Sequence, residues 1–283
     1  MISALNKLPD GTIELTITIP LKRVKTSYDE VLKKQAAKVE IKGFRKGKAP
    51  QKLVEQKIGK NALYEEVLKT LIPQVYTETV KEQNIKPILN PQIKVVSLQE
   101  GKDWQIKALT CELPEVKLGD YRVEIKKQLA PGKIWTPDKE KQTNKLTRED
   151  KIAQIFKVLA GNIQIKLPEI LVEQEVNRMF SRLIDQTNQL GLTVEQYLTS
   201  TSKTNQQLRD EYRKQAEETL KLELVLAQIA EKEKVTVTEA EIEKMIEAVP
   251  DEKVRIGLKT PDQQIYIRQL LRKRKVIDNL LKL

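Results

Sequence analysis

One short segment, Gly43-Phe44-Arg45-Lys46-Gly47-Lys48-Ala49-Pro50, combines an aromatic residue with three cations. Its two glycines allow positive φ angles, so the segment can turn tightly. Cations on a loop neutralise phosphates or carboxylates, while a ring or a guanidinium can stack or fill a pocket. The segment therefore favours binding to RNA or to an acidic protein surface. The residues leave one alternative open, in which Phe44 folds back onto flanking helices and the lysines only solvate the turn.

Side chains suited to catalysis or metal binding are scarce. The chain has no histidine and a single cysteine, Cys111. These counts exclude an intramolecular disulfide, a histidine-based metal site and histidine-driven catalysis. Cys111 lies between Thr110 and Glu112 in a strand-like run, which favours a structural thiol over a nucleophile. We predict no catalytic residue, no metal site and no cofactor.

Basic residues exceed acidic ones by 51 to 40, a net charge of +11. Residues 22–60 contain 13 basic and 4 acidic residues, so most of the excess surrounds the loop. Such a surplus attracts polyanions, with nucleic acid first among them. A second basic run, Arg272-Lys273-Arg274-Lys275, lies in the last predicted helix. It could also touch RNA, although cations near a helix C-terminus ordinarily complement the helix dipole.

The loop needs helices and a sheet to hold it. Thr12–Ile19 alternates apolar and polar side chains, which predicts a half-buried strand that ends at Pro20. Helical spacing follows over about 24–39, 50–58 and 63–83. Two further strands are predicted over 92–98 and 104–113, with a hairpin turn at 100–103. This order predicts an α+β domain over residues 1–115, with helices laid on a small antiparallel sheet.

The rest of the chain is predicted to be helical after a linker. Residues 116–147 form the predicted linker, because periodicity is weak there and Lys, Gln, Thr and Pro are frequent. Residues 148–283 are predicted to form an all-α, extended multi-helix domain, since long helices occur there with few aromatics. Three capping boxes predict helix starts: Thr193 with Gln196, Thr204 with Gln207, and Thr238 with Glu241.

The loop segment resembles the docking signature of the bacterial trigger factor family, Gly-Phe-Arg-x-Gly-Lys-x-Pro, at all six fixed positions. The resemblance implies that Phe44, Arg45 and Lys46 contact the large ribosomal subunit near the peptide exit. Gly43, Gly47 and Pro50 would shape the loop, and Lys48 would add charge. Residues 1–115 resemble the family's ribosome-binding domain throughout. The segments at 165–169 and 235–239 are more weakly similar to the starts of chaperone arms.

One departure from the family concerns its prolyl isomerase domain. Only about 35 residues separate Pro114 from the first helix near Arg148, and a chain below about 40 residues rarely folds alone. The segment offers Tyr121 and Trp135 but no Phe for an aromatic pocket. We therefore predict no isomerase activity. The alternatives are a retained isomerase, a general RNA-binding protein and a periplasmic chaperone with a related helical domain.

The resemblance implies a ribosome-associated chaperone that binds nascent polypeptides at the exit tunnel and aids their folding and export. Its partners would be ribosomal protein and rRNA near the exit, together with unfolded chains, and a homodimer of the free protein is left open. Met179, Phe180 and Leu183 are candidate client-binding residues, or else they pack one helix against another. No apolar run suits a signal peptide or a membrane span, so we expect a cytoplasmic protein without a membrane partner.

Overall fold

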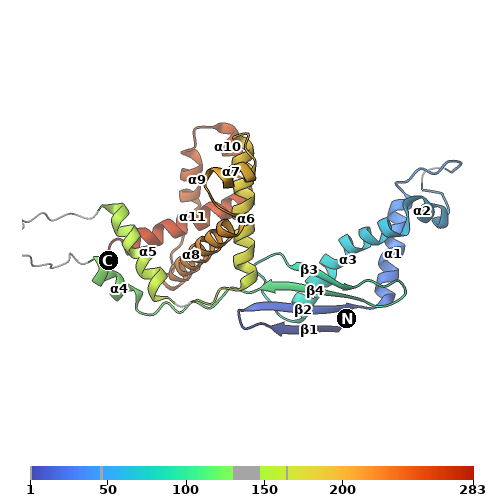
Figure 1. Ribbon diagram of the computed structural model, residues 1–283, viewed down its shortest axis with the longest axis horizontal. Helices are drawn as coiled ribbons and strands as arrows, with labels where there is room; N and C mark the ends of the chain where they lie inside the picture. Colours follow the sequence, from blue (N-terminus) through green and yellow to red (C-terminus); the bar gives the residue numbers. More distant parts are fainter. Residues whose placement is uncertain (1, 45–46, 130–146, 164) are drawn as a thin grey trace, which may run out of the picture. The chain divides into compact units, whose positions relative to one another are not determined.

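The computed structural model describes residues 2–44, 47–129, 147–163 and 165–283. They form two compact units (Figure 1). The N-terminal unit runs to Leu113 and includes Pro168–Leu171, while the C-terminal unit comprises Pro114–Leu167 and Val172–Leu283. A small antiparallel sheet with helices is thus followed by a helical region, and the predicted fold class is confirmed.

The sheet has four strands in the order β1-β2-β4-β3, and all neighbours are antiparallel. They are β1 (Ile2–Lys7), β2 (Thr12–Ile19), β3 (Gln92–Ser97) and β4 (Trp104–Cys111). The alternation in β2 buries Ile13, Leu15, Ile17 and Ile19 on one face, as predicted. The sequence analysis missed β1, which pairs with β2 along the sheet edge.

Three helices complete the N-terminal unit: α1 (Leu21–Ala36), α2 (Gln51–Ile58) and α3 (Lys60–Glu82). Their apolar faces pack with the buried face of the sheet into one core. The buried helix residues of this core are Val24, Val31, Leu32, Val54, Leu63, Val67, Leu71 and Val75. The loop between α1 and α2 is therefore carried by two helices that are anchored to a common core.

The described part of the C-terminal unit is helical. Its elements are α4 (Tyr121–Leu129), α5 (Arg148–Asn162), α6 (Glu169–Gln189), α7 (Val194–Ser200), α8 (Asn205–Lys232), α9 (Glu239–Glu247), α10 (Glu252–Leu258) and α11 (Pro261–Leu280). Tyr121 and Ile125 of α4 are buried in one core cluster with Ile155 of α5 and Ile229 of α8. Helix α4 thus occupies part of the predicted linker, 116–147, and its two buried residues lie four apart on one packed helix face.

Helix starts agree with the predicted capping residues. The backbone N–H of Gln196 donates to Thr193 Oγ1 and that of Gln207 to Thr204 Oγ1, each at 3.2 Å. At the start of α9 the Thr238 N–H donates to the Glu241 carboxylate at 2.9 Å. In the part of the chain that the structure describes, no helix has the length and apolar character needed to cross a membrane.

Candidate functional site

The loop between α1 and α2 displays its aromatic residue. Phe44 is 44% exposed, and its N–H donates to the carbonyl of Ile41 at 3.0 Å. Ile41 is half-buried against the core of the N-terminal unit. Gly43 and Gly47 have φ angles of +90° and +80°, a region that side chains disfavour. The loop therefore turns tightly on a packed base and exposes a ring. Arg45 and Lys46, which the sequence analysis also assigned to the site, lie outside the described residues.

Pro50 and Lys57 fix the far side of the loop. The Pro50 carbonyl accepts the N–H of Leu53 at 3.0 Å and so begins α2. The fixed φ angle of proline suits this place at a helix start. The ammonium of Lys57, near the end of α2, donates to the carbonyl of Glu40. These contacts join both ends of the loop to α2.

An aromatic ladder links the two loop-bearing helices to the sheet. Tyr28 of α1 donates to Glu55 Oε1 of α2 at 2.8 Å. The Tyr28 and Tyr64 ring centroids are 5.0 Å apart, and those of Tyr64 and Trp104 are 5.6 Å apart. Burial and the hydrogen bond to Glu55 raise the pKa of Tyr28. The hydroxyl therefore stays protonated and acts as the donor in this hydrogen bond. These contacts connect the loop-bearing helices α1 and α2 with α3 and β4.

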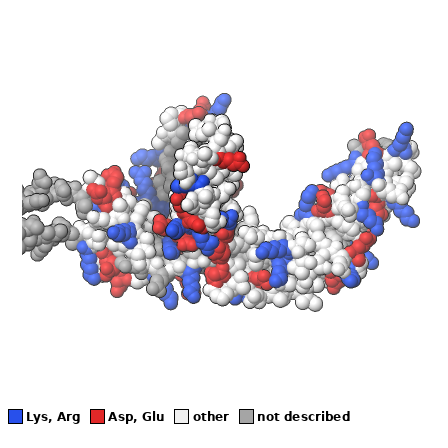
Figure 2. Space-filling model, viewed as in Figure 1, with Lys and Arg blue, Asp and Glu red and all other residues white. Residues whose placement is uncertain are grey.

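The charge around the loop is only partly neutralised within the N-terminal unit. Lys42, Lys48 and Lys52 are exposed, and none has an ion-pair partner among the described residues. Further along these helices, Arg23 pairs with Glu78 and Lys60 with Glu100. Figure 2 accordingly shows blue and red side chains interspersed over the helices of this unit. Cations without an ion-pair partner therefore include those in and next to the loop, where they can contact an anionic partner.

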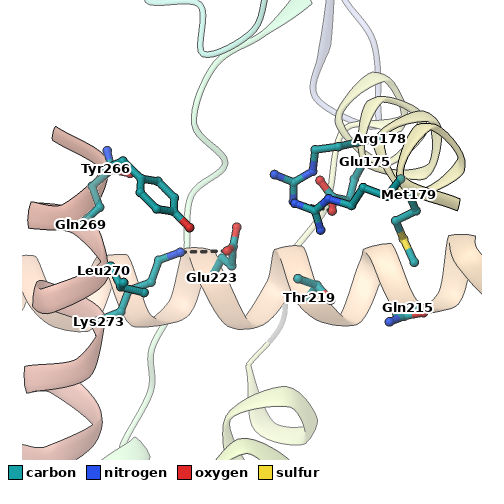
Figure 3. A pocket seen from close by; sticks show the side chains of 11 residues that line it. Glu175, Arg178, Met179, Gln215, Thr219, Glu223, Tyr266, Gln269, Leu270 and Lys273 are labelled. Carbon is teal, nitrogen blue, oxygen red and sulfur yellow. Dashed lines mark hydrogen bonds and ion pairs between the residues drawn. The ribbon is translucent and has the colours of Figure 1, made fainter. Parts of the chain in front are cut away.

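The three candidate client-binding residues on α6 have different surroundings. Leu183 is buried, and Phe180 is half-buried with its ring centroid 5.0 Å from that of Tyr212. Both belong to a small cluster that packs α6 against α7 and α8, so the structure places them between helices. Met179 instead lines a cleft of about 410 Å³ formed by α6, α8 and α11 (Figure 3).

The cleft of Figure 3 combines apolar and polar side chains. Tyr266 and Leu270 of α11 line it and are 62% and 41% exposed. Two ion pairs cross it or border it: Arg178 with Glu175 at 2.6 Å and Lys273 with Glu223 at 2.8 Å. The hydrogen bond to Glu175 raises the pKa of Arg178. Such a surface can hold apolar side chains while satisfying the polar backbone of a peptide.

Sequence analysis missed Tyr266 and Leu270, although they carry a readable signal. The two residues are four apart on α11 and therefore share a face. Ile267, which is buried against α9, lies on another face of the same helix. A second apolar face on a helix that already buries one indicates a surface available to a partner.

The basic run of α11 mainly forms hydrogen bonds and ion pairs within the helical unit. Arg272 Nε donates to the Val235 carbonyl at 3.0 Å, and Lys275 Nζ donates to the Thr236 carbonyl at 2.8 Å. Lys275 also pairs with Glu241, and Lys273 pairs with Glu223. Among the described contacts only Arg274 of the four has no partner. The hypothesis that this run binds RNA is therefore left with one free cation.

The single cysteine is enclosed in the core of the N-terminal unit. Cys111 is buried on β4, and burial raises the pKa of its thiol to about 11. It is therefore protonated at neutral pH, as a structural thiol would be. Over the described ranges, no group of three or more acidic or cysteine side chains is placed to hold a metal ion.

Two family models match the chain. The model described as "Bacterial trigger factor protein (TF)" matches residues 1–146, and "Bacterial trigger factor protein (TF) C-terminus" matches residues 137–282. The proteins named "Trigger factor" in Staphylococcus aureus strains JH9 and Newman are each 41% identical over 115 residues, which is 40% of this chain and 27% of theirs. The chain thus matches about a quarter of the length of these curated relatives.

A solved structure has the same fold. It is described as "Promiscuous Substrate Recognition in Folding and Assembly Activities of the Trigger Factor Chaperone", and it superposes with a TM-score of 0.70. The superposition covers 100% of this chain and 99% of the other, at 15% sequence identity. At that identity the likeness concerns the fold alone.

Proposed function

Because the chain belongs to the bacterial trigger factor family, we propose that it is a ribosome-associated chaperone for nascent polypeptides in the bacterial cytoplasm. The α1–α2 loop docks on the large ribosomal subunit, where ribosomal protein and rRNA lie near the exit tunnel. The helical unit then contacts the emerging chain. In this proposal residues 1–115 are the ribosome-binding domain and residues 148–283 the client-binding domain.

The observation that carries the docking role is the exposed Phe44 on a tightly turned, cationic loop. An aromatic ring exposed at a loop tip is unfavourably solvated. Its burial in a pocket of a partner removes apolar surface from water and so contributes favourable binding free energy. Lys48 and its exposed neighbours supply attraction to phosphates, and Arg45 and Lys46 add to it by the match to the family signature. The anchored base of the loop limits the conformational entropy that docking costs.

The client-binding role is supported by the exposed apolar side chains of the helical unit. Tyr266 and Leu270 line the cleft with Met179, and Ile265 nearby on α11 is 56% exposed. Exposed apolar groups rimmed by ion pairs can bind unfolded segments without a fixed sequence. Phe180 and Leu183 would contribute indirectly, by holding α6, α7 and α8 together.

The first test is co-sedimentation with bacterial 70S ribosomes at two salt concentrations. We expect the wild type to pellet and the variant Phe44→Ala/Arg45→Ala/Lys46→Ala to remain in the supernatant. The matched control is Lys81→Ala/Lys86→Ala, which also removes two positive charges, but from exposed positions of the same unit outside the loop. That control should still pellet. If all three proteins pellet equally and leave the ribosome at moderate salt, binding is diffuse charge attraction and the docking proposal is wrong.

We further propose that the chaperone works without prolyl isomerisation. Residues 114–147 separate the N-terminal unit from α5, and their helix α4 is packed into the core of the helical unit through Tyr121 and Ile125. Those side chains are therefore not available to line an active-site pocket. We expect a proline-peptide turnover assay to give the uncatalysed rate, with a known prolyl isomerase as the positive control. Turnover well above that rate would contradict the proposal.

A further inference from the structure

Three hollows of the helical unit adjoin one another along α11. The first is the cleft of Figure 3, and the second is a groove of about 430 Å³ formed by α5, α8 and α11. The two share Thr219, Glu223, Leu270 and Lys273 in their walls. A third, shallow hollow at the ends of α5 and α11 shares Arg148 and Asp278 with the groove. Together they form one continuous surface, called here the α11 track.

The middle of the α11 track is apolar. Its floor includes Ile152 of α5, Leu222 and Leu226 of α8, and Ile277 of α11. Leu226 is buried, whereas Leu270, at the junction with the cleft, is 41% exposed. A segment laid in this groove would remove apolar surface from water at about 25 cal/mol per Å².

The charged side chains of the track that have no ion-pair partner are all positive. Its carboxylates are all paired: Glu175 with Arg178 at 2.6 Å, Glu223 with Lys273 at 2.8 Å, and Asp278 with Arg148 at 2.5 Å. Four lining cations have no carboxylate partner among the described residues, namely Lys151, Arg182, Arg274 and Lys282. The cleft, the groove and the shallow hollow each have at least one of them.

Building on the proposed chaperone function, we infer that the α11 track selects unfolded segments in which aliphatic or aromatic residues are accompanied by Asp or Glu. The apolar side chains enter the groove, and the carboxylates reach the four free cations. A nucleic acid fits this surface less well, because its sugar-phosphate backbone cannot fill the apolar groove and its bases would find one tyrosine in the lining, Tyr266, for stacking. The partner is therefore a peptide of mixed apolar and acidic character.

The test uses the full chain and three fluorescent peptides of one aliphatic sequence, which carry Glu, Gln or Lys at the same positions. Fluorescence anisotropy measures their dissociation constants at low and high salt. We expect the Glu peptide to bind tightest and the Lys peptide weakest. Because exposed ion pairs are individually weak, each step should be about threefold to tenfold at low salt and should shrink at high salt. Equal affinities for the three peptides would overturn the inference.

Variants assign the preference to the track. Arg274→Glu should reduce or reverse the order of Glu and Lys peptides, while Lys214→Glu, an equal charge change at an exposed position of α8 outside the track, should leave the order unchanged. Leu270→Ser should weaken all three peptides alike, and the exposure of Leu270 makes the variant compatible with folding. If Lys214→Glu changes the order as much as Arg274→Glu does, overall charge is the cause and the track is not.

Two further measurements separate this inference from the proposed function. The chain should suppress aggregation of a chemically unfolded protein that is rich in acidic and apolar segments. If it does so while the peptides bind equally, the chaperone role stands and the acidic preference is wrong. If it binds neither peptides nor unfolded protein, the client-binding role itself fails. Tighter binding of a short single-stranded RNA than of the Glu peptide would assign the track to nucleic acid and overturn the inference.

Discussion

Glu241 is the acidic side chain whose charge the structure stabilises most directly. Lys275 Nζ donates to its carboxylate at 2.7 Å, and the Thr238 N–H donates to it at 2.9 Å. These contacts, the lysine first, lower the pKa of Glu241 from 4.5 to about 2. The folded pKa lies below the unfolded one, so the stabilisation is complete above the unfolded pKa and is lost as the pH falls toward 2.

We therefore expect Glu241→Gln to lower the urea midpoint of unfolding at neutral pH. The difference from the wild type should shrink as the pH falls from about 5 to about 2. Glu243→Gln, on the exposed side of the same helix, is the matched control and should change the midpoint little. A difference between wild type and Glu241→Gln that stays constant over this pH range would contradict the assignment.

At the residue scale, sequence predicted the exposed loop better than the client surface. Phe44 could be recognised because an aromatic between glycines and lysines has no neighbours in sequence to pack against. Phe180 and Leu183 match the spacing of an apolar helix face, but spacing does not say whether that face is covered. Tyr212 of α8, which covers Phe180, lies far along the chain. Only the tertiary packing distinguishes Met179, which lines a cleft, from Phe180 and Leu183, which pack between helices.

At the scale of elements, the hydrogen bond from Tyr28 to Glu55 joins α1 to α2. We expect Tyr28→Phe to lower the free energy of unfolding of the N-terminal unit by about 1 kcal/mol, because it removes one hydrogen bond and leaves the ring stack intact. Tyr64→Phe is the matched control, since no partner of its hydroxyl is described. Denaturant unfolding followed by tryptophan fluorescence, in a Trp135→Phe background that leaves Trp104 as the reporter, measures both effects. Equal effects of the two variants would show that the Tyr28 bond contributes nothing.

The elements that the sequence analysis missed are short or lie at edges. Strand β1 presents mainly Leu5 to the core, so its alternation is weak. The sequence Pro9-Asp10-Gly11 before β2 is nevertheless a hairpin signal, from which a partner strand could have been predicted. In helix α4 the charged residues between Tyr121 and Leu129 obscure the apolar periodicity. Helix α10 has seven residues, and none of them is buried. By contrast, long amphipathic helices and the alternating strand β2 were readable, because each buries one regular face.

At the scale of the whole molecule, charge distribution was predictable and the α11 track was not. The excess of Lys and Arg over 22–60 is a property of a continuous segment and can be counted. The track combines Ile152, Leu222 and Ile277 from three helices. Which of its cations have a carboxylate partner depends on contacts between helices. A list of residues cannot separate Arg274, which is unpaired, from Lys273 beside it, which is paired across helices.

The strand order of the N-terminal unit also affects how a new copy is made. β2 pairs with β4, so that Ile13 lies opposite Thr110, nearly a hundred residues later in the chain. Pairings of such separation close slowly because of the loop entropy they cost, whereas α1, α2 and α3 can begin from local sequence. During translation the edge of β2 that pairs with β4 keeps its backbone hydrogen-bonding groups unpaired until Cys111, the end of β4, has left the tunnel. Each new copy is then, for a time, an aggregation-prone nascent chain of the kind that its finished form is proposed to protect.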